Sequence, residues 1–273
     1  MASVHTANKS HGEADSSTGN SDHKTEKKRL YHPNRQLEWG APFRWLSLGW
    51  QDYKATWKLS ALYGAFFAFT GMAISALLWF YGTRIAIFSF GVLFILLGPI
   101  FAFGLYDVSK ELQNGNKPCL KHSLFQMRKN AGCQWVYACV LIVIGLIWMR
   151  AASIIHVFYP TSATPTIEQL TSFLMIGSVT GAFFSGLVFG TGAFSLPMMM
   201  DKECDAITAV LTSLKAVMDN TAVSVLWAVL ILTLILAGFA TGFLGLIVVL
   251  PLIGYATFHA YQDTIVSEAL PDD

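Results

Sequence analysis

Six long apolar stretches constrain what this chain can fold into more than any other feature of its sequence. Each is close to the roughly 20 residues that a helix needs to cross the hydrocarbon core of a bilayer. Backbone N–H and C=O groups inside a bilayer must be bonded internally, and the stretches are continuously apolar rather than alternating, so we expect helices and not a barrel. The predicted fold class is all-α, a polytopic bundle of six transmembrane helices. The stretches are Leu59–Phe80, Ile85–Tyr106, Cys133–Ile155, Leu174–Leu196, Thr221–Thr241 and Phe243–Tyr261.

The distribution of positive charge predicts the orientation of these helices. Of the 18 Lys and Arg residues, 16 precede the first stretch or fall in the connections after the second and fourth. Only Arg84 and Arg150 lie on the other side. The positive-inside rule therefore places both termini in the cytoplasm. The basic residues then lie beside the bilayer, so we expect anionic lipid headgroups, and not nucleic acid, as their partner.

The chain divides into three parts by composition. Residues 1–38 are polar, with no apolar run, and we expect a disordered cytoplasmic tail because such a segment cannot bury enough apolar surface to offset its ordering entropy. Residues 39–263 form the predicted six-helix transmembrane domain. Residues 264–273 form a short acidic cytoplasmic tail.

Amphipathic segments precede the first, third and fifth stretches. The first, within residues 39–57, carries Trp45, Trp50, Lys54 and Trp57, a composition typical of a helix at the membrane interface. The second covers residues 120–129. The third, from residue 206 to 219, places large apolar residues at helical spacing on one face. Asp205 directly before it is a predicted N-cap.

The even-numbered stretches share a pattern at their cytoplasmic ends. Asp107, Asp201 and Asp263 each follow a glycine by nine positions. We interpret this as three parallel repeats of an interfacial helix followed by a helical hairpin. The alternative is coincidence, because glycine is common here and aspartate favours the water edge.

The ionisable residues offer few candidates for chemistry. None lies at mid-depth in a stretch, and there is no phosphate-binding loop, nucleophile elbow or zinc-binding helix motif, so we expect no enzymatic activity, catalytic residue, metal or cofactor. The best constellation is a polar site at the cytoplasmic mouth, formed by Asp107, Asp201, Asp263 and His259. It could bind a cation, a headgroup or a partner subunit. Alternatively, each Asp pairs with a neighbouring base such as Lys110, and His259 is a hydrogen-bonded packing residue.

The fourth stretch is rich in small residues, which let helix backbones approach closely. This pattern is typical either of the central helix of a bundle or of a seam between chains. The helix-packing candidates are Gly177, Gly181, Gly186 and Gly190.

Several of these segments resemble a bacterial family of predicted integral membrane proteins, catalogued as domain of unknown function 2189. The resemblance covers the chain from about Trp39 to the C-terminus. It implies six helices and an inner-membrane location, and it brings no established activity and no catalytic residues. The segments that carry it are Gly98–Asp107, Phe194–Pro197 with Asp201, Asp205–Ala206 and Leu250–Tyr261.

Together these observations favour a non-enzymatic inner-membrane protein that is an accessory or assembly subunit of a larger membrane complex, with a respiratory complex as one candidate. Its partners would be other membrane subunits. One alternative is a small transporter or channel for a neutral or weakly polar solute, with the three aspartates at its inner mouth. Another is a lipid-organising protein, suggested by the basic, Trp-rich first amphipathic segment.

Overall fold

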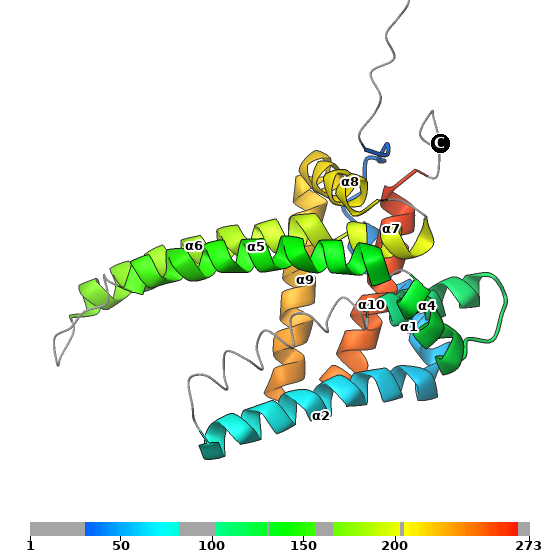
Figure 1. Ribbon diagram of the computed structural model, residues 1–273, viewed down its shortest axis with the longest axis horizontal. Coiled ribbons are helices and arrows are strands. Elements are labelled where there is room, and N and C mark those ends of the chain that lie inside the picture. The colour runs from blue at the N-terminus through cyan, green and yellow to red at the C-terminus, as the bar shows by residue number, and fades with distance from the viewer. Residues whose placement is uncertain (1–30, 82–101, 130, 157–165, 203–204, 267–273) are drawn as a thin grey trace, which may run out of the picture.

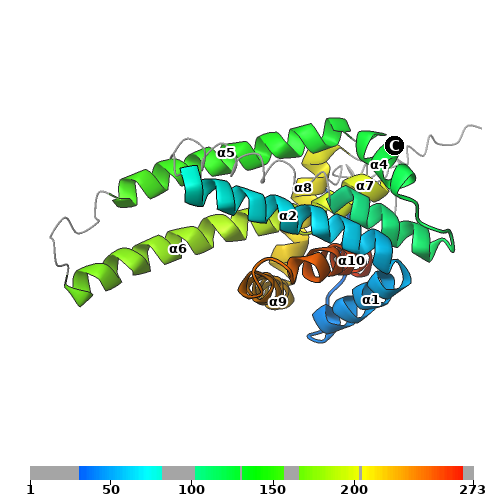
Figure 2. The ribbon, with the colours of Figure 1, turned by 90° about the horizontal axis from the view of Figure 1, so that it is seen from below.

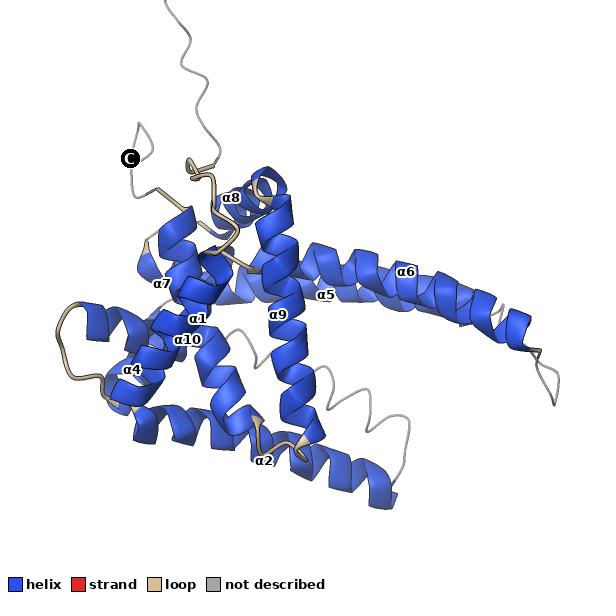
Figure 3. Cartoon of the chain, turned by 180° about the vertical axis from the view of Figure 1, so that it is seen from behind, coloured by secondary structure: helices blue, strands red, loops and turns tan. Residues whose placement is uncertain are grey.

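The computed structural model describes residues 31–81, 102–129, 131–156, 166–202 and 205–266, and they are predominantly helical (Figure 3). Residues 102–113 form a further helical segment whose start lies outside the described residues. The sole β pairing within the described ranges is a bridge between Asn34 and Ile265. The helices are α1 (Ala41–Ala55), α2 (Trp57–Tyr81), α4 (Leu120–Lys129), α5 (Ala131–His156), α6 (Ile167–Gly192), α7 (Ser195–Asp201), α8 (Ala206–Asp219), α9 (Thr221–Ala240) and α10 (Leu246–Thr264).

Four stretches of helix are long and apolar enough to cross a membrane. They are Trp57–Leu77, Gly132–His156, Ile167–Asp201 and Thr221–Ala240. The predicted second span falls largely on residues 82–101, outside the described residues. The predicted sixth span is helical as α10 but is not among the four, because its last turns carry His259, Gln262 and Asp263.

The three amphipathic segments form α1, α4 and α8, and each is followed by a long helix. Residue 130, between α4 and α5, lies outside the described residues. At two of these junctions the backbone leaves the helical region in the same way, with φ −124° and ψ 32° at Thr56 and φ −120° and ψ 40° at Asn220. At Thr56 and Asn220 a one-residue break redirects the chain from a short helix into a membrane-length one.

Helix α8 turns its large apolar residues outward and its small residues inward. Ile207 and Met218 are exposed, whereas Ala209, Ser213 and Ala216 are buried. The Ser213 hydroxyl donates to the Gly190 carbonyl at 2.7 Å and accepts the Phe194 N–H at 3.1 Å. Small residues permit this close packing on α6 and α7, and the outward apolar face is the one that a bilayer would cover.

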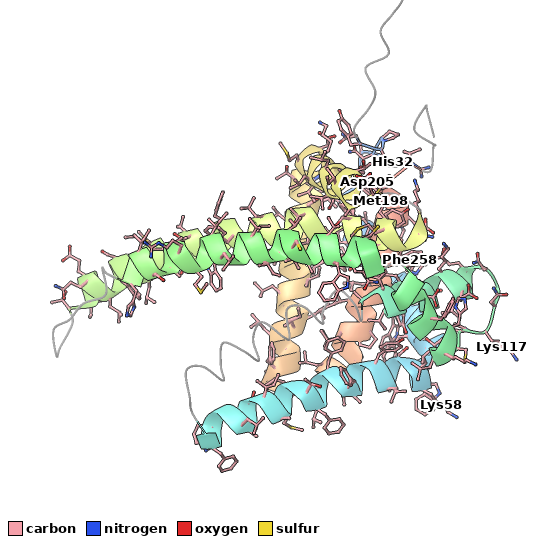
Figure 4. All side chains as sticks on the ribbon, in the orientation of Figure 1. His32, Lys58, Lys117, Met198, Asp205 and Phe258 are labelled. Atoms are coloured by element: carbon pink, nitrogen blue, oxygen red, sulfur yellow. The ribbon has the colours of Figure 1, made fainter. Side chains whose placement is uncertain are left out.

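The core lies at one end of the molecule, which we call the base. Here α1, α4, α7 and α8 meet the helical segment 102–113, the N-terminal turns of α5 and α9, and the C-terminal ends of α6 and α10. Trp45, Tyr137 and Trp227 are almost fully buried there. Figure 4 places Met198 and Phe258 inside this junction, while Lys58 and Lys117 point outward.

The long helices extend from the base in different directions. Helices α5 and α6 form a hairpin that projects away from the base (Figures 1 and 2). Helix α2 crosses the N-terminal part of α10 (Figure 1), and a Cβ at Gly64 would overlap the Ile247 backbone. Gly64 is therefore required by the close approach of two helix backbones.

The segment 31–38 differs from the expectation of disorder. The Arg35 N–H donates to the Thr264 carbonyl, and the Val266 N–H donates to the Pro33 carbonyl. The buried Asn220 side chain accepts the Leu37 N–H at 2.8 Å and donates to the Arg35 carbonyl at 3.0 Å. Partners more than 180 residues away order this segment, and composition alone could not reveal them. The rest of the predicted tail, residues 1–30, lies outside the described residues, as do residues 267–273.

Asp205 caps α8 and yields a pH-dependent prediction. Its carboxylate accepts the Thr208 N–H at 3.2 Å, and hydrogen bonding to Thr208 lowers the pKa of Asp205 below its ordinary value of 3.8. Because the folded-state pKa is lowered, the cap stabilises fully above the unfolded-state value and is lost as pH falls through the folded one. We expect Asp205→Ala to cost about 1 kcal/mol at neutral pH.

Thermal unfolding of the detergent-solubilised protein as a function of pH measures this effect. The difference between Asp205→Ala and wild type should shrink in acid. Asp205→Asn is the matched control, because it retains a capping oxygen without a charge. A penalty that stays constant with pH would contradict the role of the ionised carboxylate.

Candidate functional site

The polar residues at the base form several separate pairs. Asp263, in the last turn of α10, accepts hydrogen bonds from the Arg44 guanidinium and, at 2.8 Å, from the Trp45 indole N–H. Both partners lie in the first turns of α1. The pair with Arg44 is partly exposed, whereas Trp45 is 1% exposed. The contact to Trp45 is the more consequential one, because a buried indole N–H needs an acceptor.

Asp201 ends α7 and joins two other parts of the base. The Lys110 ammonium lies 2.8 Å from its carboxylate, and the Tyr261 hydroxyl donates to it at 2.9 Å. Lys110 comes from the helical segment 102–113, and Tyr261 comes from α10. Asp201 thus ties three helical segments together at one carboxylate.

His259 forms a polar cluster with residues of α1 and the helical segment 102–113. Its Nε2 donates to the Asp52 carboxylate at 2.9 Å, and the Ser109 hydroxyl donates to the same oxygen. The side chains of His259 and Asp52 are both largely buried. Asp52 accepts both bonds, so the serine hydroxyl bonds the acid and not the imidazole, unlike the order of a nucleophilic triad.

Asp107 is the most deeply buried of the three aspartates, with 4% of its side chain exposed. Its Oδ2 lies 3.0 Å from Nδ1 of His122, which is on α4. Burial raises the pKa of the Asp107 carboxyl, and the hydrogen bond with His122 partly offsets this effect. In such a buried site, one imidazole partner offsets only part of the free-energy cost of burying an ionised carboxylate.

The three aspartates therefore lie at one end of the molecule but have different partners. The ion pairs and hydrogen bonds among the described residues join each Asp to a base or a hydroxyl, and none joins two of the aspartates directly. Asp52, Ser109 and His122 are polar residues of this region that sequence reasoning did not select. The spacing of Asp107 and Glu111, one helical turn apart, was the available signal for a polar cluster.

The tryptophans expected at the membrane interface differ from one another in burial. Trp50 and Trp57 are exposed, and the ammonium groups of Lys54 and Lys58 lie 5.8 and 5.5 Å from the centres of their rings. Trp45 departs from the expectation, because it is buried edge-on against Trp227. The sequence of a helix with several aromatic residues does not show which of their rings packs inward.

The glycines of α6 fall into two groups. A Cβ at Gly190 would lie 3.1 Å from Leu214 of α8, so this glycine packs within the chain. At Gly177, Gly181 and Gly186 an added Cβ would have no heavy atom of the described residues within 4 Å. The described part of the chain therefore does not make α6 the central helix of a bundle along this length.

The helices define a polytopic helical membrane protein, with several helices of membrane length and a hydrogen-bonded base. The family model described as predicted integral membrane protein (DUF2189) matches residues 85–201, which confirms the resemblance seen in the sequence. The segments at 205–206 and 250–261 lie outside this match. No curated protein and no solved structure matches the chain.

The contact between Asp263 and Trp45 leads to a prediction that separates the two partners of this carboxylate. Asp263→Ala leaves a buried indole N–H without an acceptor and should lower the free energy of unfolding by about 1–3 kcal/mol. Asp263→Asn retains an acceptor and loses only a partly exposed ion pair, so its effect should be much smaller. Thermal unfolding in detergent measures both. Equal losses in the two variants would show that the charge, and not the acceptor, matters.

Proposed function

We propose that this protein is a non-enzymatic, multi-pass protein of the bacterial inner membrane that acts as an accessory or assembly subunit of a membrane complex. The charge distribution of the sequence supports an orientation with both termini in the cytoplasm. The observation that carries the proposal is the α5–α6 hairpin. In the most apolar part of each of its helices, only 6% of the residues are buried against the described remainder of the chain.

The hairpin offers surface for another membrane protein. Helix association inside a bilayer depends on close backbone approach at small residues, because lipid tails are as apolar as the side chains. Gly177, Gly181 and Gly186 provide such positions with space beside them. At the base, by contrast, the three aspartates are engaged by partners within the chain. Because these aspartates are already paired, we favour a subunit that binds its partner through the hairpin, and not a channel with an open acidic mouth.

We further propose that six spans form three units, each made of an interfacial helix and a hairpin. Corresponding positions support this proposal. Four residues after each of the junction positions 56, 130 and 220 lies a buried polar side chain, and seven residues after each lies a buried aromatic ring. The polar residues are Ser60, Gln134 and Ser224, and the aromatic residues are Tyr63, Tyr137 and Trp227.

A third correspondence relates each unit to the next. Seven residues before the junctions, Ser123 donates to the Gly104 carbonyl and Ser213 to the Gly190 carbonyl, each at 2.7 Å. The equivalent Gly49 packs directly on the α10 backbone. Each interfacial helix thus contacts the second hairpin helix of another unit through a small residue, which is the arrangement of a closed ring of three.

Bulky substitutions on α6 test the subunit role. Gly181→Leu and Gly186→Leu place side chains where the described residues leave space, so the chain should fold, but a partner helix packed there would be displaced. Val179→Leu is the matched control at an exposed position of the same helix. We would purify each tagged full chain in mild detergent and quantify partner subunits by mass spectrometry. We expect the amount of co-purified partner to fall about tenfold, equivalent to roughly 1.4 kcal/mol of binding free energy, in the glycine variants and not in the control.

Two results would contradict the proposal. One is wild-type protein that purifies without stoichiometric partners. The other is a partner content that is the same in the glycine variants as in wild type. Size-exclusion chromatography of each variant verifies that the chain itself remains folded.

A lipid-organising role is the second candidate, and the exposed Trp50 and Trp57 with their adjacent lysines favour it. Each lysine near an anionic surface is worth about 1 kcal/mol, or roughly a fivefold preference. Lys54→Gln with Lys58→Gln should therefore reduce the preference for brominated phosphatidylglycerol over brominated phosphatidylcholine, measured by tryptophan quenching in proteoliposomes. Lys117→Gln is the control, because this exposed lysine points away from the base in Figure 4. An unchanged lipid preference in the double variant would count against this role.

A further inference from the structure

Three side chains with metal-ligating atoms converge at the base beside α4. Asp107 and Glu111 lie one turn apart on the helical segment 102–113, and His122 reaches them from α4. One ligand atom from each residue lies within 4.8 Å of the other two. The sequence separates His122 from Asp107 by 15 positions and a turn, so no metal-binding motif is visible in the sequence.

The distances suit a shared ion. In a tetrahedral site two donors, each about 2.1 Å from the metal, are about 3.4 Å apart. Nδ1 of His122 and Oδ2 of Asp107 are separated by 3.0 Å. The three ligand atoms all lie within 4.8 Å of one another, so an ion between them requires the Glu111 and His122 side chains, which are not fully buried, to move slightly inward.

Hydrogen bonds outside the cluster hold these residues in place. The Ser123 hydroxyl, next to His122, donates to the Gly104 carbonyl at 2.7 Å and accepts from the Tyr63 hydroxyl at 3.2 Å. These bonds fix α4 against the segment that carries both acids. The Asn116 amide donates to the Glu111 carboxylate at 2.9 Å. Supporting bonds of this kind orient the ligands of metal sites.

Charge and access also favour a cation. The Asp107 carboxylate is almost completely buried, and the nearby Lys110 is paired with Asp201. His122 is 44% exposed, so the cluster opens to solvent on one side. A divalent ion would supply the positive charge that a buried carboxylate requires.

We propose that Asp107, Glu111 and His122 form a binding site for a divalent transition-metal ion such as Zn²⁺. Two carboxylates and one imidazole are a donor set that suits first-row divalent ions, and the remaining positions would be filled by water. Binding requires the His122 tautomer with its proton on Nε2, so that Nδ1 is a ligand. The metal site is independent of the subunit role proposed above.

Zinc binding by the purified full chain tests this proposal. The protein should carry an affinity tag without histidine, because His5, His11 and His23 in the N-terminal segment could bind zinc themselves. Isothermal titration with Zn²⁺ then compares wild type with Asp107→Asn, Glu111→Gln and His122→Gln in the same full chain. We expect one zinc equivalent to be lost, or its Kd to rise at least about tenfold, in each variant.

Asp263→Asn is the matched control, because it removes the charge of another aspartate of the base that is paired with Arg44 and not with a residue beside the cluster. It should bind zinc as wild type does. Zinc should also raise the melting temperature of wild type and of Asp263→Asn, but not of His122→Gln. His122 and Glu111 are not fully buried, so their variants carry the test if Asp107→Asn does not fold. Zinc binding that is the same in His122→Gln as in wild type, or equally reduced in Asp263→Asn, would overturn the proposal.

Discussion

Polar groups buried in this protein need partners, and that requirement determines where the helices can be held together. Within hydrocarbon the backbone is satisfied by helix formation, and apolar side chains gain little from one another. The polar contacts between segments are therefore concentrated at the base, where Trp45 meets Asp263 and Ser213 meets Gly190. The hairpin of α5 and α6 projects from this base with its apolar surface largely uncovered by the described residues.

The same requirement explains how the acidic residues are used. A carboxylate at the end of a membrane helix can face water, or it can join helices by accepting hydrogen bonds from several of them. Asp201 and Asp263 join helices in this way. Asp52 does so too, because it accepts hydrogen bonds from His259 and Ser109. Asp107 has the deepest position and the fewest partners. It is therefore the acid in this region with the greatest need for an added positive charge.

Sequence patterns predicted the local structure of this chain better than they predicted the contacts between distant residues. The bounds of α4 and the N-cap of α8 agree with helical periodicity and capping chemistry, which depend on neighbouring residues. The packing of Trp45 and the pairing of His259 with Asp52 could not be predicted, because they join α1 to α10 across more than 200 positions. The partners of the last turns of α10 were unpredictable for the same reason, since His259 and Asp263 bond to residues of α1.

The link between the two ends of the chain has a consequence for biosynthesis. Residues 31–38 are made before the described helices, yet the atoms they bind belong to Asn220, Thr264 and Val266. A ribosome adds about 5–20 residues per second, so this early segment stays without its partners for roughly 10 to 50 seconds while the hairpins are inserted. It can close over the base only after the last helix has emerged. Residues 31–38, although synthesised early, are thus among the last to reach their final position.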